Sequence, residues 1–156
     1  MGTYNHIALQ FRRNIFGLGS DHYIARQFRS DEAIGWIMNL RGTNLSFGYA
    51  GGRYGKYLED AGPSAAIDIG LSELAKIFGN EIRKDFIKGF FTTWGTYSHT
   101  MGSYAVAMPG KYGYRQTLRQ PVAKRIYFAG EACHPNLAAT VAGAFLSGQK
   151  TARQII

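Results

Sequence analysis

Four short segments rich in strand-forming residues follow one another within the first fifty positions. In the first of them, Ile7, Leu9 and Phe11 alternate with polar or small residues, which is the period-two pattern of a strand with one buried face. Only a few glycine or polar residues separate the segments, and such short connections are typical of antiparallel neighbours. The pattern predicts a mainly antiparallel sheet. Its expected strands are Tyr4–Phe11, His22–Phe28, Ala33–Leu40 and Asn44–Ala50.

The rest of the chain alternates between helical and extended patterns. A short helix is predicted over 53–60, and a longer one begins at Pro63 and ends before Gly79, because apolar residues recur there at helical spacing. Strand chemistry returns over 85–94. A final strand over 125–129 and a final helix over 140–155 complete the predicted order, so the fold class is α+β.

Composition and cysteine content restrict the class of protein. The chain has 156 residues, 46% of them hydrophobic, and no apolar run approaches the roughly 20 residues that span a bilayer. The N-terminal segment lacks the apolar core of a signal peptide. The single cysteine, Cys133, cannot form an internal disulfide and cannot build a metal cluster by itself. We therefore expect a soluble, cytoplasmic protein without a metal site or membrane partner.

The formal net charge of +8 comes from basic residues that are spread along the chain in pairs. Such a surplus can attract nucleic acid or another anionic partner. There is no long basic block and no nucleic-acid-binding motif, so a solvated basic surface is the preferred interpretation and no nucleic-acid partner is expected.

The stretch RIYFAGEACHPNLAATVAGAFLSGQ, from Arg125 to Gln149, predicts a strand, a glycine-bearing turn and a helix rich in small residues. The backbone N–H groups near Thr140 and Val141 would have no partner inside the helix and would lie at the positive end of its dipole. Two interpretations are open. A flavin ring could approach this helix end, or the small residues could simply pack closely without a ligand.

This stretch resembles the C-terminal flavin-binding motif of the flavin-containing amine oxidases, which include monoamine, polyamine and L-amino-acid oxidases and tryptophan monooxygenases. The shared features are the F-A-G-E-A turn and the T-V-x-G-A-x-L-S-G helix start. Upstream, FFTTWGTYSHTMGSYAVAMPG is similar to the family's Trp–loop–G-S-Y–P-G segment. The stretch from LSFGYAGGRYGKYLE to LAKIFG is similar to its substrate-domain strand followed by two helices, and YNHIALQF to the strand beneath the flavin. The resemblance covers nearly all of this chain but only about the C-terminal third of a family member.

The resemblance implies a division into a substrate-binding-domain-like part, residues 1–120, and a C-terminal FAD-binding strand, turn and helix, residues 121–156. The glycine clusters of the chain do not match G-x-G-x-x-G. We therefore expect the N-terminal dinucleotide-binding βαβ unit to be absent from this chain.

The resemblance also assigns cofactor-binding residues. Gly130 and Glu131 would meet the pyrophosphate–ribityl part of FAD, with the Glu131 carboxylate accepting a hydrogen bond from a ribityl hydroxyl. Thr140 and Val141, with Ala139 beside them, would present the helix N-terminus to the pyrimidine end of the flavin.

Aromatic residues are assigned to the substrate side. Trp94 would lie along the isoalloxazine and border the substrate, and Tyr104 would form one wall of an aromatic substrate cage that orients a neutral amine. Thr140 replaces the second cage aromatic of the monoamine oxidases and is also expected to face the substrate. A core role for Trp94 and a hydrogen-bonded role for Tyr104 remain as alternatives.

Two departures from the family pattern affect the chemistry. Ser103 stands where monoamine oxidases carry the cysteine that bonds to the flavin, so any FAD should be non-covalent. His6 stands where many members have a lysine that holds a water near flavin N5. Histidine could hold the same water and titrate near neutrality, so His6 and Tyr104 are the candidate catalytic residues, with a structural role for His6 as the alternative.

The implied activity is that of part of an FAD-dependent amine oxidase. In an intact relative, an amine or amino acid loses hydride to flavin N5, the imine is hydrolysed, and oxygen reoxidises the flavin to give peroxide. The chain is expected to need an N-terminal FAD-binding polypeptide or to self-associate, and a truncated or binding-only scaffold is the alternative. An amino-acid substrate, mildly preferred, would need a cation for its carboxylate, from Arg26, Arg29 or Arg41.

Overall fold

The computed structural model describes residues 1–25 and 32–155. The chain divides into two compact units. We call Thr3–Ser103 the N-terminal unit, and Met1–Gly2 together with Tyr104–Ile156 the C-terminal unit. Each unit is described by itself.

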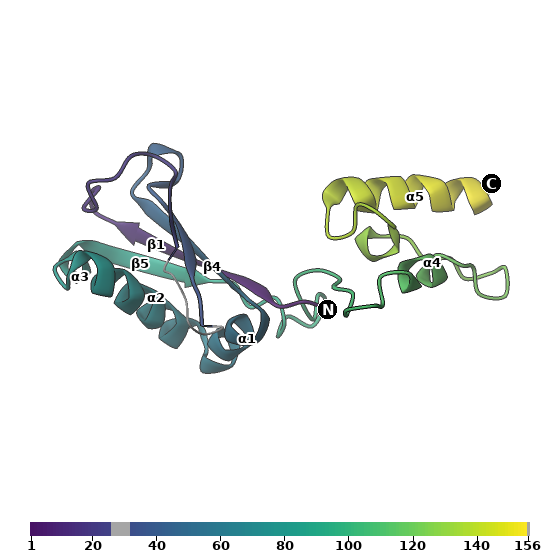
Figure 1. The fold of residues 1–156 in the computed structure, drawn as a ribbon, viewed down its shortest axis with the longest axis horizontal. Helices are drawn as coiled ribbons and strands as arrows, with labels where there is room; N and C mark the ends of the chain where they lie inside the picture. The colour runs from purple at the N-terminus through teal and green to yellow at the C-terminus, as the bar shows by residue number, and fades with distance from the viewer. Residues whose placement is uncertain (26–31, 156) are drawn as a thin grey trace. The chain divides into compact units, whose positions relative to one another are not determined.

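The N-terminal unit is built on a five-stranded antiparallel sheet with the strand order β2-β3-β4-β1-β5. The strands β2, β3 and β4 follow one another along the chain, as the meander pattern predicts, but β1 is inserted between β4 and β5 (Figure 1). The strands are β1 (Tyr4–Phe11), β2 (His22–Ala25), β3 (Gly35–Met38), β4 (Leu45–Gly51) and β5 (Phe86–Phe91).

Three helices cover one face of this sheet (Figure 1). They are α1 (Gly52–Ala61), α2 (Pro63–Phe78) and α3 (Ile82–Asp85). The alternation in β1 directs Ile7, Leu9 and Phe11 into the core that the sheet forms with the helices. Across the β3–β4 pair, Gly48 faces the Trp36 ring, and a side chain on Gly48 would overlap that ring. The glycine therefore leaves the room that the buried tryptophan needs.

The opposite face of β1 carries half-buried polar and aromatic side chains. Tyr4 and His6 lie on this face together with Phe47 and Tyr49 of the neighbouring β4. The stacked rings of Tyr4 and Tyr49 are 5.9 Å apart between centroids. The Tyr49 hydroxyl donates a hydrogen bond to the Tyr23 hydroxyl, and burial together with this contact raises the pKa of Tyr49 to about 12.

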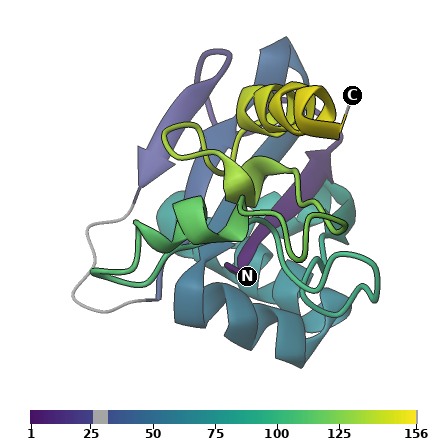
Figure 2. The same cartoon turned by 90° about the vertical axis from the view of Figure 1, so that its right-hand side faces the viewer.

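The C-terminal unit contains two α-helices and a short 3₁₀ turn. They are α4 (Tyr114–Leu118), η2 (Glu131–Cys133) and α5 (Val141–Ile155). The turn η2 lies between α5 and α4, as Figure 2 shows, and contacts both of them. Another 3₁₀ turn, η1 (Leu40–Gly42), belongs to the N-terminal unit.

The observed elements confirm the α+β class and most of the predicted order. The strand over 4–11 and the helices at 63–78 and 141–155 agree with their predicted ranges to within a residue or so. The part of the second predicted strand beyond Ala25 lies outside the described residues. The short helices α3 and α4 were not predicted, because four or five residues carry too little periodicity to be recognised.

The predicted strand over 125–129 is wrong. In the described residues this segment makes only an isolated bridge between Val122 and Ile126. A strand needs a neighbour to pair its backbone groups, and the C-terminal unit supplies no further partner among its described residues. The apolar and β-branched residues that suggest a strand here are therefore not enough to form one.

The helices carry no candidate membrane span. Among residues 1–25 and 32–155, no helix is both long enough and apolar enough to cross a bilayer.

Candidate functional site

The Glu131 carboxylate joins two loops of the C-terminal unit. Its Oε1 accepts a hydrogen bond from the backbone N–H of Ala105 at 2.7 Å, and its Oε2 accepts one from the N–H of Ala139 at 2.7 Å. Hydrogen bonds to an ionised group are roughly twice as strong as neutral ones. Because Ala105 follows Tyr104 and Ala139 precedes Thr140, one carboxylate fixes the backbone beside two residues assigned to the site.

Arg115 holds the same loop through the backbone carbonyl of Ala105. Its side chain is only 7% exposed. The guanidinium donates from Nη2 to the carbonyl of Ala105 at 3.1 Å and from Nη1 to the carbonyl of Ala132 at 3.0 Å. Ala105 is therefore clamped at its N–H by the Glu131 carboxylate and at its carbonyl by a buried cation.

Thr140 is the N-cap of α5. Its Oγ1 donates to the carbonyl of Leu137 at 2.7 Å and accepts from the N–H of Gly143 at 3.0 Å. This cap satisfies one of the donors at the start of the helix. In the part of the chain that the structure describes, the N–H of Val141 has no acceptor, and the Val141 side chain is 89% exposed. The helix end thus keeps a free donor at the positive end of its dipole.

Gly130 and Ala139 both have positive φ angles, +144° and +61°. The Gly130 N–H donates to Ser147 Oγ at 3.2 Å, and the Ala139 N–H is taken by Glu131. A side chain on Gly130 would meet no atom within 4 Å, so the backbone there is open to close approach. Any contact of these two residues with a ligand would have to use the open backbone surface, because their N–H groups are already bonded.

Tyr104 and Ser103 have defined backbone partners. The carbonyl of Tyr104 accepts from the Gly2 N–H at 2.7 Å, and its side chain is half-buried. The Ser103 hydroxyl accepts from the Tyr4 N–H at 2.9 Å and donates to the Tyr4 carbonyl at 2.6 Å. Ser103 therefore ties β1 to the segment that leads into Tyr104, and the assignment of Tyr104 to a substrate cage stays a prediction.

His6 lies on the open face of β1 between two aromatic rings. The imidazole stacks on Phe47 with a centroid distance of 4.8 Å and meets Tyr4 edge-on at 5.2 Å. Burial lowers the pKa of His6 below its ordinary value, so the ring is neutral at neutral pH. The packing agrees with the structural alternative for His6, and its catalytic role stays a prediction.

Trp94 borders an apolar hollow in the N-terminal unit. The hollow has a volume of about 310 Å³, and its aromatic lining includes Phe90 and Tyr97. Trp94 itself is 41% exposed, so it is not a core residue. The arrangement offers a flat apolar surface of the kind that a planar ring or an amine substrate requires.

Glu59 fixes the loop after Trp94 in the way that Glu131 fixes the loop after Tyr104. It lies on α1 and is 5% exposed. Its Oε1 accepts from the Gly95 N–H at 2.6 Å. Each of the two assigned aromatic residues is therefore followed directly by an N–H that donates to a carboxylate.

Glu59 and Arg115 were not among the residues expected at the site. A signal for Glu59 was available, because it follows Leu58 on the apolar side of a predicted helix and a buried carboxylate needs donors. For Arg115 the local sequence offers none, since its partners are carbonyl groups that only the fold brings together.

Of the three arginines proposed for a substrate carboxylate, the structure describes Arg41. It is exposed in η1, where its backbone N–H donates to the Asp21 carboxylate at 2.7 Å. Arg26 and Arg29 lie outside the described residues.

The residues present fit part of a flavin cofactor. The free N–H of Val141 suits an electron-rich ring edge, and the open backbone at Gly130 allows close approach. The Glu131 carboxylate uses one lone pair on each oxygen and can accept further hydrogen bonds. The sequence contains no G-x-G-x-x-G segment for the adenosine diphosphate part of FAD.

A family model matches this chain along its whole length, and known proteins match most of it. The family model described as "Flavin containing amine oxidoreductase" matches residues 1–156. A lysine-specific histone demethylase 1 homolog 1 of Oryza sativa subsp. japonica is 33% identical over 122 residues, 76% of this chain and 14% of that protein. Probable polyamine oxidase 4 of Arabidopsis thaliana is 30% identical over 154 residues, 95% of this chain and 30% of that protein. The chain thus spans less than a third of each of these relatives.

The fold has a counterpart among solved structures. Cyclohexylamine oxidase from Brevibacterium oxydans IH-35A superimposes with a TM-score of 0.74 at 21% sequence identity. The match covers 99% of this chain and 35% of that one. At this identity the likeness concerns the fold alone.

Proposed function

The chain belongs to the family of flavin-containing amine oxidoreductases, and we propose that it forms the flavin-facing and substrate-facing part of an FAD-dependent amine oxidase. The observation that carries the proposal is the start of α5, where a capped helix presents the free N–H of Val141 next to the loops that Glu131 holds together. FAD, when bound, supplies the acceptor for the hydride that leaves the α-carbon of the amine.

The C-terminal unit would bind and orient the cofactor. The Val141 N–H and the dipole of α5 stabilise negative charge at this helix end, which is the charge that develops on a reduced flavin ring. Glu131 would accept a ribityl hydroxyl with its remaining lone pairs while it keeps Ala105 and Ala139 in place. The Thr140 cap fixes the start of α5, so the Val141 N–H and the Glu131 carboxylate would keep their positions relative to each other.

Aromatic side chains would bind and orient the amine. Trp94 and Tyr104 offer ring faces that exclude water and do not compete for the amine nitrogen by strong hydrogen bonds. His6 would be neutral, because burial lowers its pKa, so its imidazole could accept a proton from a water or an amine. The contribution of the aromatic walls is orientation, which accounts for much of the rate in such reactions.

A dinucleotide-binding part, in the same or another polypeptide, would have to complete the site. This inference rests on the lengths of the relatives, of which the chain spans 14% and 30%, and on the missing G-x-G-x-x-G segment. The relatives are named for polyamines and for lysine-specific histone demethylation, so a polyamine and a methylated lysine peptide join the amino acids as candidate substrates.

The test combines the chain with a dinucleotide-binding segment that carries G-x-G-x-x-G. We expect the combined protein to purify with a flavin spectrum. Under anaerobic conditions, one class among polyamines, amino acids, cyclic amines and methylated lysine peptides should bleach it, and oxygen should restore the colour with release of peroxide. The chain alone serves as the control and should take up FAD weakly or not at all.

A combined protein that stays colourless in excess FAD would overturn the proposal and would favour a binding-only scaffold. A coloured protein that none of these amines bleaches would limit the proposal to cofactor binding and remove the oxidase assignment.

A further inference from the structure

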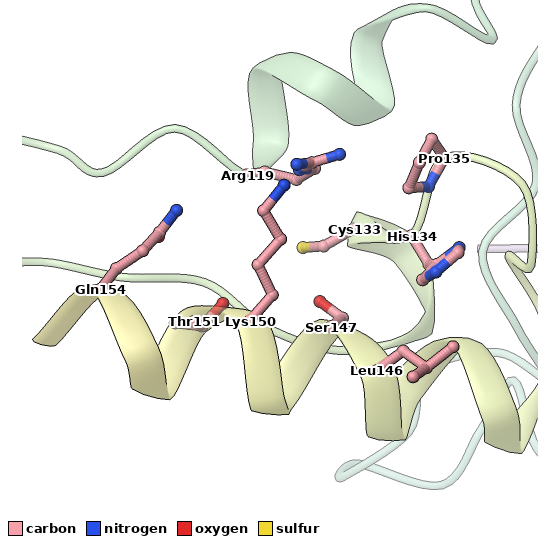
Figure 3. Close-up of a pocket in the computed structure, with 9 residues that line it drawn as sticks. All are labelled: Arg119, Cys133, His134, Pro135, Leu146, Ser147, Lys150, Thr151 and Gln154. Carbon is pink, nitrogen blue, oxygen red and sulfur yellow. The ribbon is translucent and has the colours of Figure 1, made fainter. Parts of the chain in front are cut away.

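A polar hollow in the C-terminal unit lies apart from the flavin-facing end of α5. It has a volume of about 150 Å³ and lies between α5 and the segment of α4 and η2 (Figure 3). Lys150, which lines it, follows Val141 by nine residues, roughly 13 Å along a helix axis. The hollow is therefore not the place where the proposed function puts the flavin ring.

Two cations enter this hollow from different elements. Arg119, directly after α4, and Lys150 of α5 both point into it, as Figure 3 shows. Among the described residues neither of them forms an ion pair, and no acidic side chain lines the hollow. Glu131 lies on the neighbouring turn and does not line the hollow; its two oxygens accept the N–H groups of Ala105 and Ala139. Two like charges therefore share a small space with no acidic side chain in its lining, an arrangement that an anion would stabilise.

The uncharged polar groups of the hollow also offer donors. Ser147 Oγ accepts the Gly130 N–H at 3.2 Å, so its own hydrogen is free to donate. His134 Nδ1 accepts the Leu137 N–H at 2.9 Å, so a neutral ring carries its proton on Nε2 and donates from there. Together with the guanidinium and the ammonium, the lining presents several donors.

We propose that this hollow binds a phosphate group. A tetrahedral dianion places oxygens toward several donors at once and balances both cations, whereas a carboxylate offers two oxygens and a single charge. The volume exceeds the roughly 30 Å³ of one water several-fold, so a phosphate group fits together with water. The ligand is either free inorganic phosphate or the terminal phosphate of a small molecule that projects from the mouth.

Cys133 makes the proposal measurable. It is the only cysteine of the chain, and it is a buried lining residue of the hollow. Burial raises the pKa of its thiol, so alkylation by iodoacetamide is followed at mildly alkaline pH. A phosphate group in the hollow should slow this alkylation, by about tenfold when its concentration is ten times its dissociation constant.

The experiment uses the full chain and compares inorganic phosphate, ADP and sodium chloride at equal ionic strength. Phosphate is expected to slow the alkylation of Cys133 and to shift its own ³¹P resonance on binding. Protection by ADP at lower concentration than phosphate would assign the ligand to a nucleotide, the adenosine diphosphate part of FAD included, and equal or weaker protection would assign it to the free ion.

Matched variants separate the site from general charge effects. Lys150→Gln and Arg119→Gln should each lose most of the protection. Arg153→Gln removes the same charge from an exposed residue of the same helix that does not line the hollow, so it should keep the protection. Equal slowing by chloride, or protection that survives the Lys150→Gln and Arg119→Gln double variant, would mean an adventitious ion only and would overturn the proposal.

Discussion

Replacing Glu131 tests whether one carboxylate holds the two loops of the site. Glutamine keeps one acceptor oxygen and turns an NH₂ group toward the second backbone N–H. Because the Ala105 N–H is the less exposed of the two donors, the glutamine oxygen should stay on Ala105 and release Ala139. Alanine at the same position removes both acceptors.

The magnitude follows from the two contacts, each 2.7 Å long. A hydrogen bond to a charged group contributes about 1.5–3 kcal/mol, and an N–H that returns to water costs less than one that stays buried without a partner. We therefore expect a loss of about 1–2 kcal/mol for Glu131→Gln and about 3 kcal/mol for Glu131→Ala. A loss of 1.4 kcal/mol corresponds to about a tenfold increase in the opening equilibrium.

Amide hydrogen exchange by NMR, with the urea midpoint as a second reading, measures these losses. In Glu131→Gln the Ala139 amide should exchange about tenfold faster while the Ala105 amide keeps its protection, and in Glu131→Ala both should lose it. Glu81→Gln, an exposed position whose carboxylate pairs with Lys84, is the control and should change neither amide. The reasoning is refuted if both amides keep their wild-type protection in Glu131→Ala.

A Cβ on Gly143 would overlap the carbonyl oxygen of Leu137, so Gly143→Ala should lower the free energy of unfolding by about 1–3 kcal/mol. Gly148→Ala is the control: a Cβ there meets nothing within 4 Å, so the free energy of unfolding should stay equal or rise. Urea unfolding that finds Gly148→Ala less stable than Gly143→Ala would contradict the prediction. Burial lowers the pKa of His6 in the folded state. The stability that the neutral imidazole contributes is therefore complete above the unfolded pKa of 6.5 and is lost as the pH falls through the folded pKa. Between pH 7.5 and 5.5 the urea midpoint should drop more for the wild type than for His6→Phe, and equal drops would contradict this prediction. The pKa of Tyr49, raised to about 12, means that its ring signals in NMR should stay unshifted at a pH near 10.5 where exposed tyrosines titrate.

The N-terminal sheet was largely predictable, because its information is local. Alternation in 4–11 defines β1 together with its buried face, and Pro63 and Gly79 bound α2. The insertion of β1 between β4 and β5 was not predictable, since it depends on which strands pair over long distances in the chain. The strand over 125–129 failed for a related reason, because a strand is stable only with a neighbour that the local pattern does not specify.

The candidate site, like the sheet, was predictable only where local sequence determines the structure. The start of α5 could be located from the sequence, because Thr140 is a good N-cap and small residues follow it. The hydrogen bond from the Ala105 N–H to Glu131 could not be predicted, because Ala105 lies 26 residues away in the chain and meets the carboxylate only in the folded unit. Glu59 is a further example, since the Gly95 N–H that it accepts lies 36 residues away.

The most direct test of the central claim removes a single N–H from the start of α5. Proline is tolerated at the first helical position, and the N-cap residue before it already has non-helical backbone angles. Val141→Pro should therefore keep the helix and lose only the donor, whereas Val141→Ala keeps the donor and loses the side chain.

The measured quantity is the midpoint potential of bound FAD, in the chain combined with a dinucleotide-binding part. If the Val141 N–H stabilises the reduced ring by about 1.5–3 kcal/mol, Val141→Pro should lower the potential by roughly 30–60 mV, while Val141→Ala should match the wild type. Equal potentials for Val141→Pro and Val141→Ala, with FAD still bound, would contradict the placement of the flavin at the start of α5.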